Sequence, residues 1–369
     1  MIYVNNYILF AMIMSTRNYT SLGIMTGTSL DGVDISLISS DGYNKIIFID
    51  GKTYKFSNEI KKLLKSCLGA KKNDSIIDLA EHEYTDYVIQ KIKDFLKNKK
   101  NKIDVIGFNG QTINHSPNSG FSWQLGNAKK ISKYFKVKTV YNFRENDIKN
   151  GGNGAPLSPI YHYLLKNKFK MKNVAFLNLG GISNLTIISN RKMIALDCGP
   201  CCSISDEFTK KFKNKSFDHE GKFAFQGKEE IKIVKNLLRR NYFKIKPPKS
   251  LDRLDFTIND FCELNVYDGL ATINRFIVET VYLAIKEHIK NMDYIVLLGG
   301  GRKNLNLISK LKNKFGKKIK ICEDFGINGD LTESNAFAYL AIRFLKHLPI
   351  SYPGTTGVKK PTIGGKLVL

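Results

Sequence analysis

Apolar and polar residues alternate along the chain with spacings that predict both strands and helices. Two short apolar runs, at residues 22–25 and 35–38, flank a polar stretch and predict two strands joined by a tight turn. Residues 75–97 carry apolar side chains at helical spacing. Residues 294–298 form a continuous apolar run, which is typical of a central parallel strand. Together these segments predict an α/β protein.

The second half of the chain repeats the beginning of the first half. Residues 174–181 predict a strand that ends in a glycine turn, and residues 185–189 and 193–196 predict two further strands. The same succession of strand, turn of small residues and strand occupies residues 22–39. The two segments are similar in pattern rather than residue by residue, and this pattern predicts an internal duplication.

The turn between the first two strands has the composition of a phosphate-binding turn. It reads GIMTGTSLDGVD over residues 23–34 and combines small hydroxyl side chains, glycines and the carboxylates of Asp31 and Asp34. Glycine lets backbone N–H groups approach phosphate oxygens, and a carboxylate can hold Mg²⁺ directly or through water. The alternative is a β-hairpin that is merely rich in turn-forming residues.

Polar side chains also follow the strand predicted at residues 103–107. Gln111, Thr112 and His115 come shortly after it, at the strand end where open α/β sheets place their ligands. We therefore take them as candidate ligand contacts. For His115 the alternative is a loop histidine with an ordinary hydrogen bond.

Residues 142–157 predict a mobile polar loop. Arg144 and Asp147 precede three glycines within four residues. Arg144 suits a carboxylate or sugar-acid substrate, because a guanidinium binds a carboxylate through paired hydrogen bonds. A linker between domains is the alternative.

Two carboxylates and a run of glycines occupy positions that are common in active sites. Asp197 ends the third strand of the repeat and is a catalytic, metal-linked or helix-capping residue. Glu333 lies in the first turn of a helix predicted over residues 331–345, where the helix dipole alone also favours a negative charge. The glycines at 299–301 follow the strand at 294–298 and allow close approach of a nucleotide base or phosphate.

Composition narrows the class of protein. The chain has 369 residues, enough for about two domains, and its hydrophobic content of 43% is that of a globular protein. The net charge of +25 can indicate an anionic partner, but the lysines are scattered and no nucleic-acid motif accompanies them. We interpret them mainly as solvated surface charge. The six cysteines show no secreted spacing, which predicts reduced thiols in the cytoplasm and no zinc site.

The N-terminal residues 1–14 are apolar but too short to span a bilayer, and they lack the basic first region of a signal peptide. A weak signal peptide and an upstream-extended start, with translation from Met12 or Met14, both fit this stretch. No other run approaches transmembrane length, so we expect no membrane association.

Seven motifs, in this order, closely resemble those of the 1,6-anhydro-N-acetylmuramic acid kinase family: GTSLDGVD, NGQTINH, NFRENDIKNGGNGAP, NLGGISN, DCGP, LLGGG and TESNAFAYLA. That family belongs to the actin/hexokinase/heat-shock ATPase superfamily, and the resemblance covers residues 22–365. It implies an α/β fold of two duplicated ribonuclease-H-like (actin-like ATPase) domains with a cleft between them. The expected boundaries are an N-terminal extension at 1–18, domain I at 19–136 plus 346–369, and domain II at 137–345.

The resemblance also implies a reaction. In the family, water opens the anhydro ring and the freed sugar O6 takes the γ-phosphoryl group of ATP, which gives N-acetylmuramic acid 6-phosphate and ADP in cell-wall recycling. The implied cofactors are ATP and Mg²⁺, and the implied partner is a small anhydro amino sugar. The family also suggests a homodimer in the cytoplasm, with no nucleic acid as partner.

Residue roles follow from position in the motifs. Asp197 would be the general base that takes a proton from the attacking water, and Glu333 matches an active-site glutamate near the sugar. Asp31 is the expected Mg²⁺-associated carboxylate. The implied substrate-binding residues are Gln111, Thr112, Arg144 and Asn153, with Arg144 a partner for the lactyl carboxylate. The implied phosphate- and adenosine-binding residues are Gly27, Thr28, Ser29, Leu30, Asp31, Gly32, Val33, Asp34, Gly180, Gly181, Gly299, Gly300 and Gly301.

The chain departs from the family pattern at four positions. Asn109 stands where the family usually has His, Asn153 where it has Gln, Cys201 where it has Gly and Cys202 where it has Asn. None of these changes removes Asp197, so we expect catalysis to be retained and sugar specificity to be affected. Two alternatives stay open: a related sugar or sugar-acid kinase without ring opening, and a nucleotide-sensing or nucleic-acid-binding protein that uses the positive charge.

Overall fold

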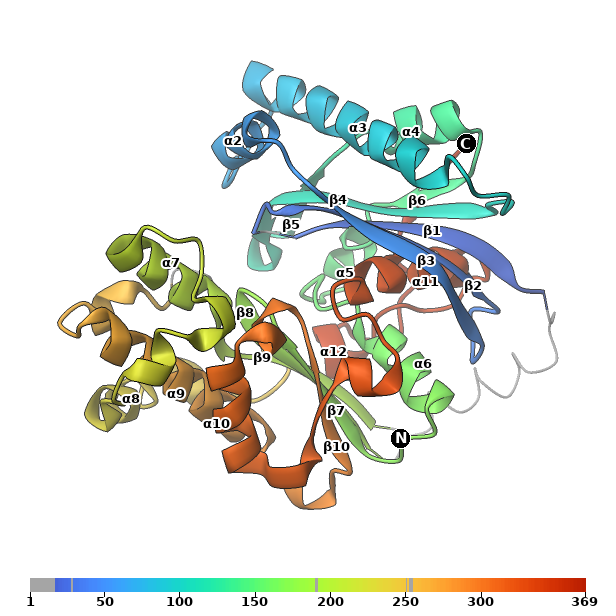
Figure 1. The fold of residues 1–369 in the computed structure, drawn as a ribbon. Coiled ribbons are helices and arrows are strands. Elements are labelled where there is room, and N and C mark those ends of the chain that lie inside the picture. Colours follow the sequence, from blue (N-terminus) through green and yellow to red (C-terminus); the bar gives the residue numbers. More distant parts are fainter. Residues whose placement is uncertain (1–16, 28, 190–191, 250, 252–254) are drawn as a thin grey trace. The chain divides into compact units, whose positions relative to one another are not determined.

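The computed structural model describes residues 17–27, 29–189, 192–249, 251 and 255–369. The chain divides into two compact units (Figure 1). Unit 1 runs up to Lys170 and resumes over Leu331–Leu369, and unit 2 is Met171–Asp330. No helix in this described part combines the length and the apolar character needed to cross a membrane. The expectations for residues 1–16 and for Thr28 lie outside the described residues.

Unit 1 is built on a seven-stranded mixed sheet of order β12-β6-β4-β1-β2-β3, with β5 paired to β4. Strand β2 runs antiparallel to both β1 and β3, whereas β4 runs parallel to β1 and β6 runs parallel to β4. The expected hairpin between the first two strands is therefore confirmed. The strands are β1 (Tyr19–Thr26), β2 (Gly32–Ser40), β3 (Ile46–Lys55), β4 (Val105–Ser116), β5 (Phe121–Leu125), β6 (Thr139–Tyr141) and β12 (Lys366–Val368).

Helices cover both faces of this sheet, and Figure 1 shows α3 and α4 on one face and α11 on the other. Helix α11 lies so close that two strands need glycine beneath it. A Cβ atom at Gly23 would lie 1.9 Å from the carbonyl oxygen of Ser334, and one at Gly107 would lie 2.2 Å from that of Phe337. The helices are α2 (Asn58–Ser66), α3 (Ser75–Leu96), α4 (Ala128–Phe135), α5 (Glu145–Lys149), α6 (Pro159–Lys168), α11 (Thr332–Leu345) and α12 (Pro353–Thr356).

Unit 2 repeats the same strand order in a five-stranded sheet, β11-β10-β7-β8-β9. Its first three strands are antiparallel, and β10 and β11 continue the sheet in parallel from β7. Two units with one order and one set of strand directions confirm the duplication and the ribonuclease-H-like fold. The strands are β7 (Val174–Leu179), β8 (Ile182–Ser189), β9 (Lys192–Pro200), β10 (Tyr294–Leu298) and β11 (Ile319–Ile321).

Four α-helices accompany this sheet among the described residues, and α9 forms the centre of the unit 2 core, with Leu270, Ile273, Phe276 and Ile277 all buried. They are α7 (Cys202–Lys213), α8 (Ile231–Leu237), α9 (Val266–Ile285) and α10 (Leu305–Phe315). Short 3₁₀ segments lie at η1 (Pro117–Ser119), η2 (His219–Gly221), η3 (Ala224–Gln226), η4 (Asn241–Lys244), η5 (Ile258–Phe261), η6 (Ile289–Asn291), η7 (Gly300–Lys303), η8 (Gly316–Lys318) and η9 (Cys322–Phe325).

The division between the units differs from the expected domain boundary. The sequence expectation places residues 137–170 and 331–345 in the second domain, whereas in the structure both segments belong to unit 1. The reason is that β6 pairs with β4, and α11 packs against β1, β2 and β4 of the first sheet. Helical periodicity identifies α11 but cannot tell which of two similar sheets it covers.

Candidate active site

The turn between β1 and β2 is shaped by two residues that face the protein. The Leu30 N–H donates to the Gly27 carbonyl at 3.2 Å, and Leu30, at a φ of 57°, buries its side chain in the core. Gly32 is required by close packing, because a Cβ atom there would lie 2.2 Å from the carbonyl oxygen of Tyr54. Ser29 is exposed. Gly27, Ser29 and Asp31 are therefore the described residues of the turn that a ligand can reach.

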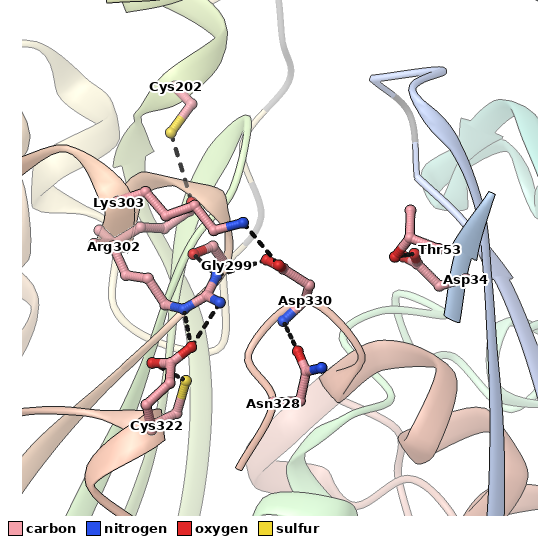
Figure 2. A network of polar contacts seen from close by, with 11 residues as sticks. Asp34, Thr53, Cys202, Gly299, Arg302, Lys303, Cys322, Asn328 and Asp330 are labelled. Carbon is pink, nitrogen blue, oxygen red and sulfur yellow. Dashed lines mark hydrogen bonds and ion pairs between the residues drawn. The ribbon is translucent and has the colours of Figure 1, made fainter. Parts of the chain in front are cut away.

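The two carboxylates of this region have different surroundings. Asp31 is 75% exposed, and one of its oxygens accepts from Lys61 Nζ at 3.2 Å. Asp34 lies on β2 and accepts a hydrogen bond from Thr53 Oγ1 at 2.5 Å (Figure 2). Val33, between them, is fully buried and contributes to packing. Asp31 is thus the more open of the two for a hydrated cation.

Gln111 and Thr112 lie within β4, which extends to Ser116 and thus well beyond the strand predicted at 103–107. Gln111 is fully buried, and its Nε2 donates to the Thr112 carbonyl at 3.1 Å. Its Oε1 has no hydrogen-bond partner among the described residues. A buried amide oxygen without a donor is unfavourable, so Gln111 is prepared to accept a hydrogen bond from a ligand or water. His115 makes an ordinary hydrogen bond, 2.8 Å from Nδ1 to Ser122 Oγ.

The glycine-rich loop at residues 151–154 is fixed by the buried carboxylate of Asp147. Its Oδ1 accepts from the Gly154 N–H at 2.6 Å, and its Oδ2 accepts from Thr356 Oγ1 at 2.6 Å. The Asn153 N–H also donates to the Thr356 carbonyl, at 2.7 Å. The prediction of a mobile loop is therefore wrong: α5 on one side and the C-terminal α12 on the other hold it in place.

Arg144 and Glu333 influence each other inside unit 1. Arg144 Nη1 donates to the Gly154 carbonyl at 2.9 Å, while its buried Nε has no hydrogen-bond partner in the described part of the chain. Although part of the Glu333 side chain is exposed, desolvation by the surrounding protein raises its pKa; the Asp34 carboxylate raises it further, and the Arg144 guanidinium lowers it. The structure thus brings the charges of Arg144, Glu333 and Asp34 near enough to one another to shift the Glu333 pKa.

In unit 2, the turn between β7 and β8 is tied to the start of α7. The N–H groups of Cys201 and Cys202 donate to the carbonyls of Gly181 and Gly180, at 3.0 and 2.9 Å. The Ser203 hydroxyl also donates to Gly181, at 2.7 Å. These two bonds use the backbone N–H groups of Cys201 and Cys202, so they do not depend on the departure from the family pattern, while the Cys202 thiol adds a contact to the Leu179 carbonyl at 3.6 Å. A Cβ atom at either glycine would come no nearer than 3.4 Å to another atom, which leaves space for a ligand.

The three glycines after β10 differ in the space that surrounds them. Gly299 has a φ of 76°, and a Cβ atom there would lie 2.3 Å from Asn178 Oδ1. A Cβ atom at Gly301 would lie 2.8 Å from Leu179 Cβ. At Gly300 nothing lies within 4 Å. Gly299 and Gly301 therefore serve packing against the end of β7, and Gly300 alone offers open backbone to a ligand.

Arg302 follows these glycines, and the sequence predicts no role for it. Its buried guanidinium donates to Glu323 Oε1 at 2.8 and 2.7 Å, to Asp330 Oδ1 at 2.8 Å and to the Gly299 carbonyl at 2.9 Å (Figure 2). Lys303 Nζ adds a contact to Asp330 Oδ2 at 2.7 Å. The network fixes the glycine turn to Asp330, which is the last residue of unit 2.

Asp197 lies on β9 and does not cap a helix, since Cys201 occupies the N-cap position of α7. Burial raises its pKa to about 6, against a hydrogen bond from the Leu251 N–H and the positive charge of Lys249, which both lower it. The Leu251 N–H reaches Oδ2 at 2.9 Å. A carboxylate with a pKa near neutrality is suited to general-base catalysis.

A family model described as anhydro-N-acetylmuramic acid kinase matches residues 19–369. The chain belongs to this family. The anhydro-N-acetylmuramic acid kinases of Zymomonas mobilis and Pelagibacter ubique are each 38% identical to it, over 361 and 369 residues, and the matches cover 94% and 95% of this chain and 99% and 98% of theirs. Among solved structures, a ROK family glucokinase from Streptomyces griseus in complex with glucose and AMPPNP is 12% identical, with a TM-score of 0.41 and coverage of 87% of this chain and 99% of that chain.

Several residues that hold the candidate site in place are not predicted from the sequence. The sequence does contain a signal for Arg302, because this charged residue directly follows a glycine turn. A charged residue is unusual at a position that is buried. The sequence predicts Asp147 only as part of a polar loop, although it precedes the glycine whose N–H it binds. Thr356 and Tyr242 give no local signal, because their partners are 209 and 45 residues away in the chain.

Proposed function

We propose that this chain is the kinase that opens 1,6-anhydro-N-acetylmuramic acid with water and phosphorylates O6 of the freed sugar at the expense of ATP. The products are N-acetylmuramic acid 6-phosphate and ADP, and the reaction serves the recycling of cell-wall sugars. The match to one kinase family over residues 19–369 carries the proposal. The settings of Asp197, Arg144 and Gln111 support it.

In the proposed reaction Asp197 takes a proton from the water that attacks the anomeric carbon. The new C1–O bond forms as the C1–O6 bond breaks, and O6 keeps the electron pair. O6 then attacks the γ-phosphorus, and the bond to the β-phosphate oxygen breaks to release ADP. A base with a pKa of about 6 is mostly ionised at neutral pH, so it can accept this proton.

Unit 1 supplies the groups that we assign to the sugar. The unpaired Arg144 Nε can donate to the lactyl carboxylate, and the unpaired Gln111 Oε1 can accept from a hydroxyl or from the acetamido N–H. Glu333, held near Arg144, can accept from a sugar hydroxyl. Thr112 follows Gln111 in the chain, and Asn153 precedes Gly154, whose carbonyl accepts from Arg144, so these two residues complete the proposed substrate contacts.

The nucleotide contacts that we propose lie on the turns of both units. Gly27 and Ser29 in unit 1 and the turn at 180–181 in unit 2 have space for phosphate oxygens. Gly300 has open space for adenosine. Asp31 fits Mg²⁺, because its exposed carboxylate can bind the ion through water, and the ion when bound would offset the negative charge of the phosphates.

The proposal is tested by incubating the protein with ATP, Mg²⁺ and 1,6-anhydro-N-acetylmuramic acid, and by following the sugar with mass spectrometry. In ¹⁸O-labelled water we expect one labelled oxygen in the sugar 6-phosphate, since ring opening adds water at C1. Formation of ADP with a different phosphorylated sugar, and none from the anhydro sugar, would overturn the proposal in favour of a related sugar kinase. Salt-dependent nucleic-acid binding without kinase activity would overturn it in favour of a binding protein.

We also propose that the enzyme is a homodimer of the cytoplasm, as the family resemblance implies. Sedimentation equilibrium should give twice the chain mass of 41.8 kDa. A single-chain mass at micromolar concentration would contradict the dimer without affecting the proposed reaction.

A further inference from the structure

Asp197 lies on the edge strand of its sheet. Strand β9 ends the order β11-β10-β7-β8-β9 and pairs only with β8 among the described strands. The outward-facing backbone groups of an edge strand need partners or water. At Asp197 both groups find partners on one irregular segment: the Asp197 N–H donates to the Lys249 carbonyl at 3.0 Å, and the Tyr242 hydroxyl donates to the Asp197 carbonyl at 2.7 Å.

Tyr242 and Lys249 are also joined to each other. Lys249 Nζ donates to the Tyr242 carbonyl at 3.0 Å and lies 4.2 Å from the centre of the Tyr242 ring. The ring packs against Phe243 and Phe256, with centroids 5.4 and 6.4 Å away. The pair is therefore anchored in the aromatic core of unit 2, and it can hold β9 in a fixed position.

We propose that Tyr242 and Lys249 are positioning residues for the catalytic Asp197. They bind the two backbone groups of Asp197 that the sheet leaves unpaired, and the Lys249 ammonium places a positive charge beside the carboxylate. The position of a general base relative to its substrate water must be correct to within about 0.5 Å, so the backbone bonds from Tyr242 and Lys249 act on the rate of the chemical step. The inference rests on the proposed role of Asp197 as the base.

Lys249 also acts on the charge of the base. The groups that face the Asp197 carboxylate or its two positioning residues are Lys249, the Cys198 thiol on β9 itself and Asp255, which acts on the Tyr242 phenol. Lys249 is the cation among them, and it lowers the Asp197 pKa against the effect of burial. Removal of its charge must therefore raise that pKa, and the base will lose its proton only at higher pH.

The test compares Lys249→Met and Tyr242→Phe with the wild type by steady-state kinetics between pH 5 and 8. For Lys249→Met we expect kcat to fall about tenfold at pH 6.5 and the acid limb of the pH–rate profile to move to higher pH, while KM for ATP stays unchanged. For Tyr242→Phe we expect a fall in kcat of about tenfold with little movement of the limb, because the charge is kept. Lys249→Arg should restore the position of the limb.

The chain offers a matched control in the same unit. Lys213 Nζ, on α7, donates to the Tyr267 hydroxyl on α9 at 3.0 Å and lies 4.6 Å from the centre of its ring, so this pair is a second cation–π contact between a lysine and a tyrosine. Lys213→Met and Tyr267→Phe should keep the wild-type profile. In an Asp197→Asn background, Lys249→Met should cause no further loss, because the base that it positions is gone.

Three outcomes are distinguishable. Wild-type kcat and an unmoved limb in Lys249→Met and Tyr242→Phe would overturn the inference. A further tenfold loss of kcat for Lys249→Met in the Asp197→Asn background would overturn it as well, since the lysine would then act independently of the base. Absence of the sugar 6-phosphate with the wild-type protein would overturn the proposed function instead. Circular dichroism melting curves of each variant separate these effects from loss of folding.

Discussion

The two units share one strand order but treat its third strand differently. In unit 1 the third strand is β3, an edge strand with most of its residues exposed, among them Ile47 at 59% and Ile49 at 38%. In unit 2 the third strand is β9, whose carboxyl-terminal half is largely buried and whose edge is bound by Tyr242 and Lys249. The same topology thus gives an open edge in one unit and a protected carboxylate in the other.

The origin of this difference lies between α7 and α9. This stretch of unit 2 holds α8 and several 3₁₀ segments, and it supplies both residues that cover β9. Unit 1 has no counterpart after β3 in its described residues, where α2 and α3 follow directly. The shared strand order therefore places Asp197 on β9, and the segment between α7 and α9 supplies the groups that bind it, while burial raises its pKa to about 6.

The largest effect on activity is expected for Asp197→Asn, which removes the carboxylate that distinguishes unit 2. We expect kcat to fall about 10³-fold, since the amide cannot accept the proton of the attacking water, while KM for ATP changes little. In the wild type, kcat/KM for the sugar should fall as pH drops below about 6, because the base becomes protonated. A coupled enzymatic assay of ADP release measures both the kcat of the variant and the pH dependence of the wild type. A near-normal rate for the variant would show that another residue is the base. The buried carboxylate of unit 2 would then have no catalytic role.

The counterpart in unit 1 is Glu333. Glu333→Gln keeps the size of the side chain but removes the charge that opposes Arg144, so we expect kcat/KM for the sugar to fall about 10²-fold with KM for ATP nearly unchanged. Initial rates at varied sugar concentration measure this. Glu83→Gln, an exposed glutamate on α3, is the control and should behave as the wild type. Equal effects on ATP and sugar would mean that unit 1 does not specialise in the sugar.

A feature of the fold or the site could be predicted from the sequence when the residues that determine it lie close together in the chain. The hairpin at β1 and β2 and the glycine turn after β10 are determined by consecutive residues, and their placement was confirmed. Asp197 does lie on the predicted strand, but the prediction that the strand ends there is wrong, because β9 continues to Pro200 in pairing with β8. The catalytic and ligand roles of Asp197, Glu333 and the turn residues stay predictions, which the experiments above address.

Features that depend on distant partners could not be predicted. The loop at 151–154 looks mobile in sequence because glycines dominate it, and only Thr356, 209 residues after Asp147, shows that it is held. The place of α11 in unit 1 depends on Gly23 and Gly107, whose missing side chains let the helix approach. Glycine in a strand indicates a close approach but does not name the element that approaches.

A smaller effect is expected where unit 1 fixes its glycine loop. Thr356→Val removes the hydroxyl that donates to Asp147 Oδ2 and leaves that oxygen buried without this donor, which should cost about 1–3 kcal/mol of folding stability. The loosened loop should raise KM for the sugar several-fold and leave KM for ATP unchanged. Thermal melting and sugar titrations check the two effects. Thr356→Ser keeps the hydroxyl and should retain wild-type values; if both variants match the wild type, Asp147 does not need this bond.

The smallest effects separate the glycines of unit 2. Gly301→Ala places a methyl group 2.8 Å from Leu179 Cβ and 2.9 Å from Cys202 Sγ, so it should destabilise the protein by about 1–3 kcal/mol. Gly300→Ala meets open space, and its stability should stay within about 0.5 kcal/mol of the wild type. If Gly300 faces the nucleotide as proposed, this variant should still raise KM for ATP a few-fold. A variant that is stable and has an unchanged KM would show that the open glycine marks no ligand, and that unit 2 binds ATP through its other turn.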